Sequence, residues 1–449
     1  MKQAAAIGAP LAEVLRAAAA VWVQVCRGRA LDRTLREQSL PPDRAPHIAA
    51  AVRDVCHGAL RHRAVIDAIL KCLVARAPQA HIGGLLAVAL SQLLEGTYRD
   101  HVLVDQAVAA AQADERTGAA AGFVNAVLRS FLRQRATLVP RFLQDDATRL
   151  NVPDWWLRKV RHDHPEQWEG ALACAARAPA LVLRVNRRRC SVEQYLARLL
   201  HEQIAAEQVG AVAVRLQRPC PIERIPGFLD GLVSVQDAGA QLAAPWLQAG
   251  DDMRVLDACA APGGKTGHLA EMSDALIDAV ELDAGRAGLI DENLRRLGLM
   301  TSRVRVLNAD ALHAADFWDG QPYQRILLDA PCTGSGIVRR HPDIPWLRRE
   351  ADVAQLATIQ TRLLDALWPL LAPAGRLLYV VCSVFLEEAD RQADSFLGRH
   401  PDARLAPLPD LGLGSLQLLP AGADPVGSGP NVGLPTEHDG FFFALFEKV

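Results

Sequence analysis

Two hydrophobic patterns divide the chain. From about residue 10 to residue 148, apolar residues recur at spacings of three and four, the period of amphipathic helices. Gly, Pro and Asp residues separate the runs, so this region is predicted to be a domain made only of helices. The clearest helical runs are residues 11–27, 47–60, 65–75, 83–94 and 123–132.

A second segment, residues 149–235, mixes strand and helix signals. The apolar run 181–186 is typical of a strand, and Ser191 with Gln194 has the spacing of a capping box that starts a helix. These signals predict a small α/β module. The three arginines 187–189 either grip phosphates or form a solvated turn, and the pattern leaves both alternatives open.

From residue 236 onward, short apolar runs alternate with helical stretches. This alternation predicts a doubly wound, Rossmann-like parallel sheet, in which ligands bind beyond the carboxyl ends of the strands. Each predicted strand ends in a polar residue or a cysteine, so these side chains are expected to line one edge. The strands are expected at residues 255–257, 277–281, 304–310, 325–329 and 376–382.

The C-terminal part completes this picture. A Pro/Gly-rich stretch, residues 401–435, predicts a surface loop, and the aromatic run 441–446 predicts a last strand that is antiparallel to the strand ending at Cys382. At ~100–200 residues per domain, 449 residues allow two or three domains. The predicted domains span residues 8–148, 149–235 and 236–449.

The loop after the first strand of the third domain carries a distinctive motif. Asp257 ends an apolar run, small residues and paired glycines follow, and a helix begins near Thr266. A phosphate-gripping GxxxxGK[ST] loop is excluded because Cys259 stands where its first glycine belongs, and GxGxxG is absent. We therefore expect a nucleoside ligand without a pyrophosphate, which S-adenosylmethionine fits. The predicted cofactor-binding loop residues are Cys259, Ala260, Ala261, Pro262, Gly263, Gly264 and Lys265.

Two acids beyond neighbouring strands extend this predicted cofactor site. Glu281 lies 24 residues after Asp257, and an acid about 20 residues beyond a glycine loop typically accepts hydrogen bonds from ribose hydroxyls. Asp310 follows the third strand, where a carboxylate suits the exocyclic amine of adenine. An N-cap or a solvated turn is the alternative for either acid.

Two cysteines stand at the ends of neighbouring predicted strands. Cys332 follows Asp329-Ala330-Pro331, a pattern of acid and proline typical of enzymes that methylate bases, and Cys382 comes 50 residues later. Either cysteine alone is better interpreted as an apolar filler. Both at one sheet edge, beside a cofactor loop, indicate covalent chemistry, with Asp329 placed to contact both the cofactor and a pyrimidine.

Methylation at carbon 5 of cytosine needs such a thiol. Carbon 5 is a poor nucleophile, and a thiolate that adds to carbon 6 raises its electron density enough to accept a methyl group. A second group must then help to remove the carbon-5 proton so that the enzyme is released. The thiolate form is required, and Lys265 is a possible cation beside it.

Composition and charge narrow the setting. The chain is 50% hydrophobic and 22% charged. Its nine cysteines include no CxxC pair, so a metal knuckle or a disulfide framework is not expected. We expect reduced thiols and a cytoplasmic location instead. The short apolar patch 17–25 is interpreted as an amphipathic helix, and no membrane span is predicted. Residues 1–235 hold 31 Lys and Arg against 22 Asp and Glu, so this half is the better candidate to contact a polyanion.

Taken together, these motifs resemble one enzyme family. The loop 257–265, the stretch 329–336 with the following Arg339-Arg340-His341, and Cys382-Ser383 are similar to the RsmB/Sun family of bacterial 16S ribosomal RNA cytosine-C5 methyltransferases. Residues 123–129 resemble the helical RNA-binding domain of the antitermination factor NusB. The resemblance covers nearly the whole chain.

The resemblance implies roles for individual residues. Cys382 is the expected nucleophile, Cys332 is expected to assist product release, and Asp329 joins both the catalytic and the cofactor-binding sets. Apart from the resemblance, Arg339, Arg340 and His341 follow the glycine-rich loop and are expected to form a phosphate clamp for RNA, with a solvated loop as the alternative. The chain departs from the family pattern at Val381, where Thr is usual, and at Glu281, where Asp is commoner; neither change removes a required group.

The expected partner is 16S ribosomal RNA in an unassembled or partly assembled small subunit. We expect a monomer without metal or membrane contact. Two alternatives remain: the same chemistry on transfer RNA, or an RNA-binding assembly factor with a silent catalytic domain.

Overall fold

The computed structural model describes residues 10–38, 45–422 and 434–449. It divides into two compact units. The first unit contains Met1–His162 and the segment Arg340–Arg349, and the second contains Asp163–Arg339 and Glu350–Val449. The segment 340–349 therefore belongs to the first unit although it lies within the sequence of the second.

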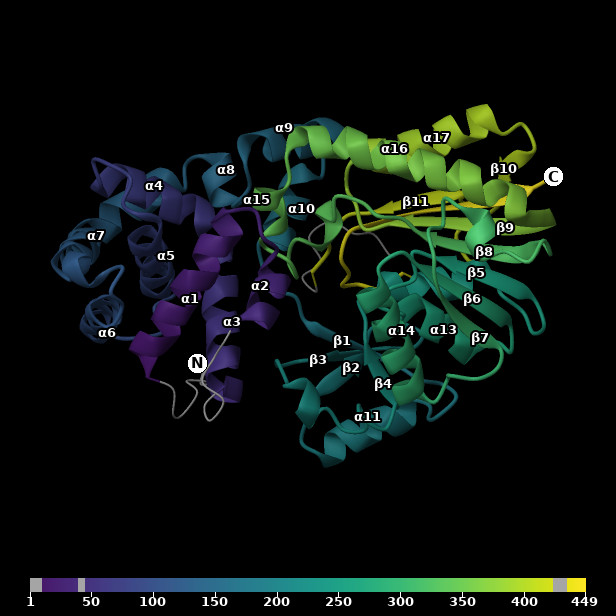
Figure 1. The fold of residues 1–449 in the computed structure, drawn as a ribbon, viewed down its shortest axis with the longest axis horizontal. Coiled ribbons are helices and arrows are strands. Elements are labelled where there is room, and N and C mark those ends of the chain that lie inside the picture. The colour runs from purple at the N-terminus through teal and green to yellow at the C-terminus, as the bar shows by residue number, and fades with distance from the viewer. Residues whose placement is uncertain (1–9, 39–44, 423–433) are drawn as a thin grey trace. The chain divides into compact units, whose positions relative to one another are not determined.

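The first unit is made of helices, as predicted (Figure 1). Its core lies between α1, α3, α5 and α6, and α5 is buried over most of its length because its apolar residues are not confined to one face. The helices are α1 (Leu11–Cys26), α2 (Leu31–Glu37), α3 (Ala45–Arg61), α4 (Arg63–Leu73), α5 (Ala80–Glu95), α6 (Asp100–Gln112), α7 (Ala121–Phe142), α8 (Asp146–Arg149) and α9 (Asp154–Asp163).

The segment 340–349 is fixed to this helical unit by specific contacts. The Asp343 carboxylate accepts a hydrogen bond from the backbone N–H of Leu31 at 2.8 Å. His341 Nδ1 lies 3.3 Å from a carboxylate oxygen of Asp32, and the pair raises the pKa of His341. The segment contains the short helix α15 (Ile344–Leu347). Nothing in the hydrophobic pattern predicts this long-range association.

The second unit begins with a small α/β module, which confirms that prediction. Its four strands form an antiparallel sheet in the order β2-β3-β1-β4, and the Ser191–Gln194 capping box starts its helix α11. The elements are α10 (Trp168–Ala175), β1 (Leu181–Val185), α11 (Val192–His201), β2 (Ala206–Gln208), β3 (Ala213–Leu216) and β4 (Val233–Val235).

The arginines that follow β1 lie in an exposed turn, as one of the two alternatives expected, and Arg188 and Arg189 also contact protein there. Arg188 donates to the backbone carbonyl of Ser273 at 2.8 Å, at the end of the helix α13 (Gly264–Met272), and pairs with Asp274 at 2.8 Å. On β1 itself, Arg184 is fully buried, and its Nη2 donates to Glu271 at 2.7 Å. These contacts favour a structural role for this part of the module, which they join to α13.

The rest of the second unit is the predicted doubly wound sheet. The strand order is β10-β12-β9-β8-β5-β6-β7, and β7, β6, β5, β8 and β9 are parallel. The aromatic last strand pairs antiparallel with β9, as the sequence predicted. These strands are β5 (Arg254–Ala258), β6 (Leu276–Glu281), β7 (Val304–Asn308), β8 (Tyr323–Asp329), β9 (Leu371–Val381) and β12 (Phe441–Lys448).

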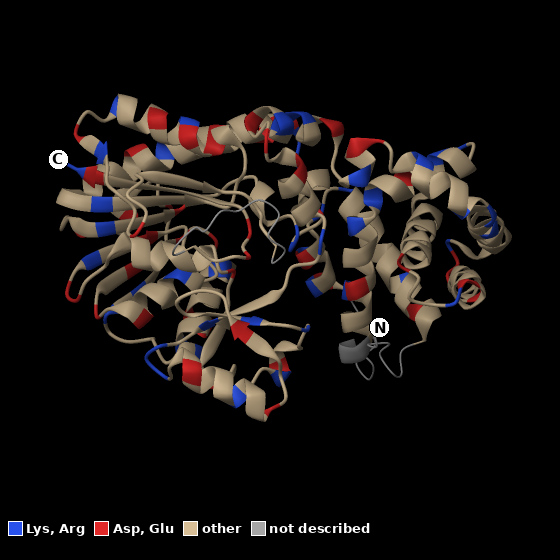
Figure 2. Cartoon of the chain, turned by 180° about the vertical axis from the view of Figure 1, so that it is seen from behind, with Lys and Arg blue, Asp and Glu red and all other residues tan. Residues whose placement is uncertain are grey.

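Helices cover both faces of this sheet (Figure 1). The helices α12 (Ala243–Leu247), α13 and α14 (Ala284–Leu297) enclose one apolar core, and α16 (Glu350–Leu367) with α17 (Asp390–Arg399) encloses the other. Side chains on opposite sides of the strands fill these two cores. Figure 2 shows that acidic and basic residues occur on helices of both units and on strands of the second.

One prediction about the C-terminal part was wrong. The stretch 401–435 is not a loop throughout, because β10 (Ala403–Leu405) and β11 (Ser415–Leu418) both pair with β12. Both strands are too short to give a clear alternating pattern between the surrounding glycines and prolines. Residues 423–433 of this stretch lie outside the described residues.

The described ranges 10–38, 45–422 and 434–449 contain neither a membrane span nor a metal-binding group. Every helix in them is too short or too polar to span a lipid bilayer. In the same ranges, no group of three or more His, Cys, Asp or Glu side chains is arranged to hold a metal ion.

Candidate active site

The loop between β5 and α13 needs small residues for a geometric reason. Cys259 has φ 61° and Gly263 has φ 88°, which is the left-handed region of backbone space. A Cβ atom on Gly263 would lie 3.0 Å from the Cα atom of Ile290, so the left-handed turn and this close packing both require glycine. The loop thus turns sharply from the strand into the helix N-terminus.

Asp257, just before this loop, is buried, and only one of its two carboxylate oxygens has a hydrogen-bond partner among the described residues. Its Oδ2 accepts a hydrogen bond from the Thr266 hydroxyl at 2.6 Å. Its Oδ1 has no hydrogen-bond partner among the described residues. Burial raises the pKa of Asp257 to about 7, because the ionised form loses its hydration. A buried polar atom of this kind leaves a hydrogen bond that a water or a polar ligand group can complete.

Glu281, at the end of β6, is tied to the glycine loop. Its Oε2 accepts from the backbone N–H of Ala261 at 3.2 Å, and its Oε1 accepts from the N–H of Asp283 at 3.1 Å. Arg286 lies 3.6 Å from the same carboxylate and donates to the carbonyl of Ala261 at 3.1 Å. The contacts orient the Glu281 carboxylate beside the loop, and sequence reasoning anticipated none of them.

Asp310 lies in a turn two residues beyond β7. Its Oδ1 accepts from the backbone N–H of Leu312 at 2.9 Å, and its Oδ2 lies 3.4 Å from Nδ1 of His313. The carboxylate is partly exposed. The local contacts of Asp310 are therefore those of a turn, which was the alternative interpretation. Its position beyond the carboxyl end of a strand is the one that the cofactor interpretation predicted.

Lys265 and Asp329 form an ion pair beside the loop. Lys265 Nζ donates to Oδ2 of Asp329 at 2.6 Å. Burial opposes the charged ammonium, but the charge and hydrogen bond of Asp329, together with the charge of Cys382, outweigh it and raise the pKa of Lys265. The lysine therefore stays a cation near the Cys382 sulfur, which is the environment that a thiolate needs.

The two strand-end cysteines meet. The Sγ atoms of Cys332 and Cys382 lie 3.3 Å apart, and both side chains are partly accessible. The hydrogen bond with Cys382, helped by burial, raises the pKa of Cys332 well above that of a free thiol. Two negative charges at this distance repel strongly, so we expect Cys332 to keep its proton.

The third cysteine of this region, Cys259, differs from that pair. Burial raises its pKa to about 12, so its thiol stays neutral. This fits the expected small residue in the wall of the site. Val381, the departure from the family pattern, is completely buried in the core and contributes no polar group to the site.

The backbone that follows Cys332 is held against the Cys382 strand end. The N–H of Gly336 donates to the carbonyl of Cys382 at 2.9 Å, and the N–H of Gly440 donates to the carbonyl of Gly336 at 2.8 Å. A Cβ atom on Gly336 would collide with the Gly440 carbonyl oxygen. Glycine at 336 is therefore needed for the three segments to come together.

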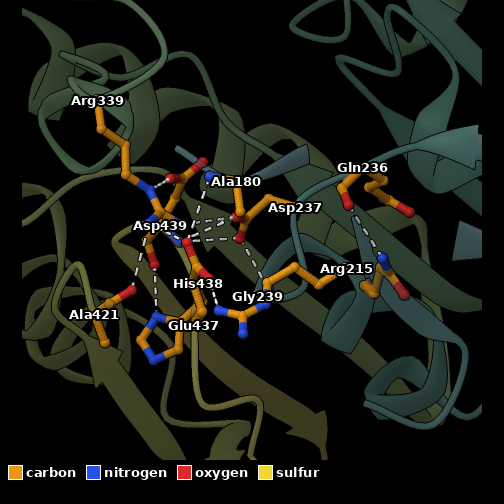
Figure 3. Close-up of polar contacts among 11 residues, drawn as sticks. Ala180, Arg215, Gln236, Asp237, Gly239, Arg339, Ala421, Glu437, His438 and Asp439 are labelled. Carbon is orange, nitrogen blue, oxygen red and sulfur yellow. Dashed lines mark hydrogen bonds and ion pairs between the residues drawn. The ribbon is translucent and has the colours of Figure 1, made fainter. Parts of the chain in front are cut away.

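Arg339 ends this loop inside a cluster of three carboxylates (Figure 3). Its guanidinium pairs with Asp439, with Asp237 at 3.4 Å and with Glu437 at 3.3 Å. Glu437 also accepts from Arg215 at 2.7 Å. The cluster joins the loop to the C-terminal segment and to the α/β module, and all of it belongs to the second unit.

This placement contradicts the expected phosphate clamp at Arg339. The side chain is only 3% exposed and its guanidinium is already shared among carboxylates, so it is not available to RNA. His341 is paired with Asp32 in the first unit. The sequence interpretation erred because a run of basic residues does not reveal acidic partners about 100 positions away.

Replacing Arg339 with methionine should destabilise the protein by about 3–5 kcal/mol, because removing one partner leaves buried carboxylates without a counter-charge. The surface pair Arg404–Glu447 is a matched control, and Arg404→Met should cost less than about 1 kcal/mol. Urea unfolding of both variants measures the difference. Equal midpoints for the two would show that the buried cluster contributes no more than a surface pair.

Sequence reasoning also missed the buried polar groups beneath the two cysteines. Glu388 is fully buried and accepts hydrogen bonds from the hydroxyls of Thr333 and Ser383, each at 2.6 Å. Gln360 donates to the same carboxylate at 3.1 Å. The available signal was weak: Glu388 and Gln392 are four residues apart, a spacing that places two polar residues on one side of a helix.

Comparison with known proteins agrees with this architecture. The family model for 16S rRNA methyltransferase RsmB/F matches residues 244–447. The RsmF/B-like ferredoxin-like domain matches residues 152–223, and the NusB family matches residues 14–133. The predicted NusB-like, α/β and methyltransferase parts are thereby confirmed as fold types.

Curated relatives and solved structures cover most of the chain. It is 36% identical over 452 residues to Ribosomal RNA small subunit methyltransferase B of Vibrio cholerae, covering 96% of each chain. The protein of that name from Escherichia coli is 38% identical over 405 residues, covering 89% of this chain and 90% of that one.

Two solved structures extend the comparison. The crystal structure of PH0851 is similar in fold, with a TM-score of 0.76 at 23% identity, over 97% of this chain and 99% of that one. A methyltransferase homolog from Pyrococcus horikoshii has a TM-score of 0.55 at 28% identity, over 68% of this chain and 97% of that one. From these matches, and above all from the identity to the two curated relatives, the chain belongs to the RsmB/F family of 16S rRNA methyltransferases.

Proposed function

We propose that the protein transfers a methyl group from S-adenosylmethionine to carbon 5 of a cytosine in 16S ribosomal RNA, through a covalent bond between Cys382 and carbon 6. The observation that carries this proposal is the 3.3 Å separation of the Cys382 and Cys332 sulfurs at the ends of adjacent parallel strands. A thiol that only fills space needs no second thiol beside it. Covalent addition at carbon 6 followed by removal of the carbon-5 proton needs two groups close to one base.

The residues at the sheet edge fit S-adenosylmethionine. The loop of Cys259, Ala260, Ala261, Pro262, Gly263, Gly264 and Lys265 offers close backbone approach, as its left-handed residues support. Glu281, held beside the loop, is the proposed acceptor for ribose hydroxyls, Asp310 is the proposed acceptor for the adenine amine, and the unsatisfied Oδ1 of Asp257 can accept one further hydrogen bond. When bound, the cofactor supplies an electrophilic methyl group on a sulfonium.

Cys382 begins the reaction as a thiolate. Its sulfur adds to carbon 6 of the pyrimidine, and the electron pair of the 5,6 double bond becomes available at carbon 5. There a bound sulfonium would give up its methyl group and keep the electron pair of the broken sulfur–carbon bond. Lys265 keeps positive charge near this sulfur, and Asp329 is in position to accept a hydrogen bond from the polar edge of the pyrimidine. The target base must leave its stack to reach this edge.

Cys332 acts in the release step. Before addition, its pKa is raised chiefly by the hydrogen bond with Cys382. Once Cys382 is bonded to carbon 6, that hydrogen bond and the charge behind it no longer exist, and the Cys332 thiol ionises more readily. It then takes the proton from carbon 5, the electron pair reforms the double bond, and the Cys382 sulfur leaves.

Transfer of labelled methyl tests the proposal directly. Purified protein, labelled S-adenosylmethionine and 16S rRNA from a strain lacking the protein should yield 5-methylcytidine in that RNA, detected by nucleoside mass spectrometry. Free 16S rRNA and assembled small subunits are compared, and the free or partly assembled RNA is expected to be the better substrate. Cytoplasmic location and a monomeric state remain predictions.

Transfer RNA is the control substrate. Label in transfer RNA and none in 16S rRNA would favour the alternative substrate. Binding of 16S rRNA without any label, while calorimetry detects no S-adenosylmethionine binding, would leave an assembly factor with a silent catalytic domain.

A further inference from the structure

Glu388 is a buried carboxylate that the proposed reaction does not use. It lies six residues beyond Cys382, in the short helical turn Leu386–Glu388, and none of its surface is exposed. Burying a carboxylate is costly unless it is fully hydrogen-bonded. Its position next to a reacting thiolate adds a like charge, so its presence there calls for a specific reason.

The carboxylate connects the two cysteine-bearing segments. Oε2 accepts from the hydroxyls of Thr333 and Ser383, both at 2.6 Å, while Oε1 accepts from the backbone N–H of Thr333 at 2.9 Å. Thr333 directly follows Cys332, and Ser383 directly follows Cys382. A single side chain therefore fixes the residue after each cysteine.

Further hydrogen bonds hold this connection in place. Ser335 Oγ lies 2.9 Å from Ser383 Oγ and accepts from the N–H of Val384 at 2.9 Å. Gln360 Nε2 donates to Oε1 of Glu388 at 3.1 Å and to the carbonyl of Pro331 at 2.9 Å. Both neighbours of Cys332 and the two residues after Cys382 are thus tied into one buried network, which restricts where the two sulfurs can move.

Tyr379 also hydrogen-bonds to members of this network. Its hydroxyl is 3.0 Å from Oε1 of Gln360 and 2.8 Å from the backbone carbonyl of Glu388. Tyr379 lies on β9, the strand that leads into Cys382. The backbone of Glu388 is therefore held by the strand that leads into one cysteine, and its carboxylate is bonded to the loop that carries the other.

We propose that Glu388 is a positioning residue that sets the separation of the Cys332 and Cys382 sulfurs by accepting hydrogen bonds from Thr333 and Ser383. This inference rests on the proposed function, in which both thiols act on neighbouring carbons of one base. A displacement of ~1 Å at a reacting centre costs on the order of 10²-fold in rate. Loss of the network should therefore change the rate by a measurable factor.

Disulfide formation between the two cysteines reports their separation without RNA or cofactor. In diamide, the two thiols lose two electrons and two protons to the azo group of the reagent and form one S–S bond, which peptide mass spectrometry assigns to positions 332 and 382. Glu388→Gln keeps the shape but replaces one acceptor oxygen with a donor. We expect its cross-linking rate to fall at least about tenfold, with kcat falling more than KM.

Matched variants separate positioning from folding. Glu387→Gln, which alters a surface carboxylate 3.1 Å from Arg391, should cross-link like the wild type. Thr333→Ser keeps the hydroxyl and should also do so, whereas the nearly isosteric Thr333→Val should behave like Glu388→Gln. The Thr333 pair keeps the test decisive if Glu388→Gln does not fold.

The outcomes distinguish this inference from the proposed function. Unchanged cross-linking in Glu388→Gln and Thr333→Val would overturn the positioning role, even in an active enzyme. A wild type that transfers no methyl, combined with slow cross-linking in the two variants, would refute the reaction and leave the positioning role supported.

Discussion

Replacing Cys382 with alanine is expected to abolish methyl transfer, by a factor on the order of 10³ or more. Without the sulfur, carbon 6 receives no nucleophile and carbon 5 stays too electron-poor to accept the methyl group. Lys265 and Asp329 would still bind and orient, but they cannot supply the missing electron pair. The measurement is single-turnover incorporation of labelled methyl into unmodified 16S rRNA.

The control is another free cysteine of the second unit. Cys220 lies in a loop of the α/β module, where its sulfur is 3.5 Å from the carbonyl of Pro221. Cys220→Ala should turn over like the wild type, and both variants should melt at similar temperatures. Incorporation at the wild-type rate in Cys382→Ala would refute covalent catalysis at this position.

The parts of the fold that sequence reasoning predicted correctly are those that local pattern determines. Apolar residues at spacings of three and four predicted the helical unit. The alternation of strand and helix patterns predicted that the strands around β5 are parallel. A parallel sheet places all carboxyl ends of its strands at one edge, so residues 50 apart in sequence, Cys332 and Cys382, could be expected to meet. The 3.3 Å contact has the same origin.

What sequence reasoning missed depends on partners far apart along the chain. Arg339 looked like a surface cation because its carboxylates, Asp237 and Asp439, lie 102 and 100 residues away. The assignment of residues 340–349 to the helical unit rests on contacts with residues near position 32, more than 300 positions away. Periodicity carries no information about such pairings.

Glu388 illustrates a different limit. It lies in the short helical turn Leu386–Glu388, and an acid five residues beyond Ser383 is visible in the sequence. An isolated glutamate on a predicted helix is nearly always solvated, however, and only the coordinates reveal that Thr333 and Ser383 bring their hydroxyls to it. The local composition cannot distinguish a surface acid from a buried one that is fully hydrogen-bonded.

Replacing Cys332 with alanine is expected to trap the enzyme on its RNA. Addition by Cys382 and methyl transfer remain possible, but the proton at carbon 5 loses its acceptor, so turnover should fall about 10²–10⁴-fold. The covalent complex then accumulates and appears as a protein–RNA band on a denaturing gel. The band should contain the transferred methyl group, because the block comes after methyl transfer.

The double variant Cys332→Ala/Cys382→Ala locates the bond. It should give no denaturation-resistant band, since the sulfur that forms the adduct is absent. A Cys332→Ala enzyme that turns over normally and leaves no adduct would contradict the release role. The 3.3 Å contact would then have no part in release, and another base would have to complete the reaction.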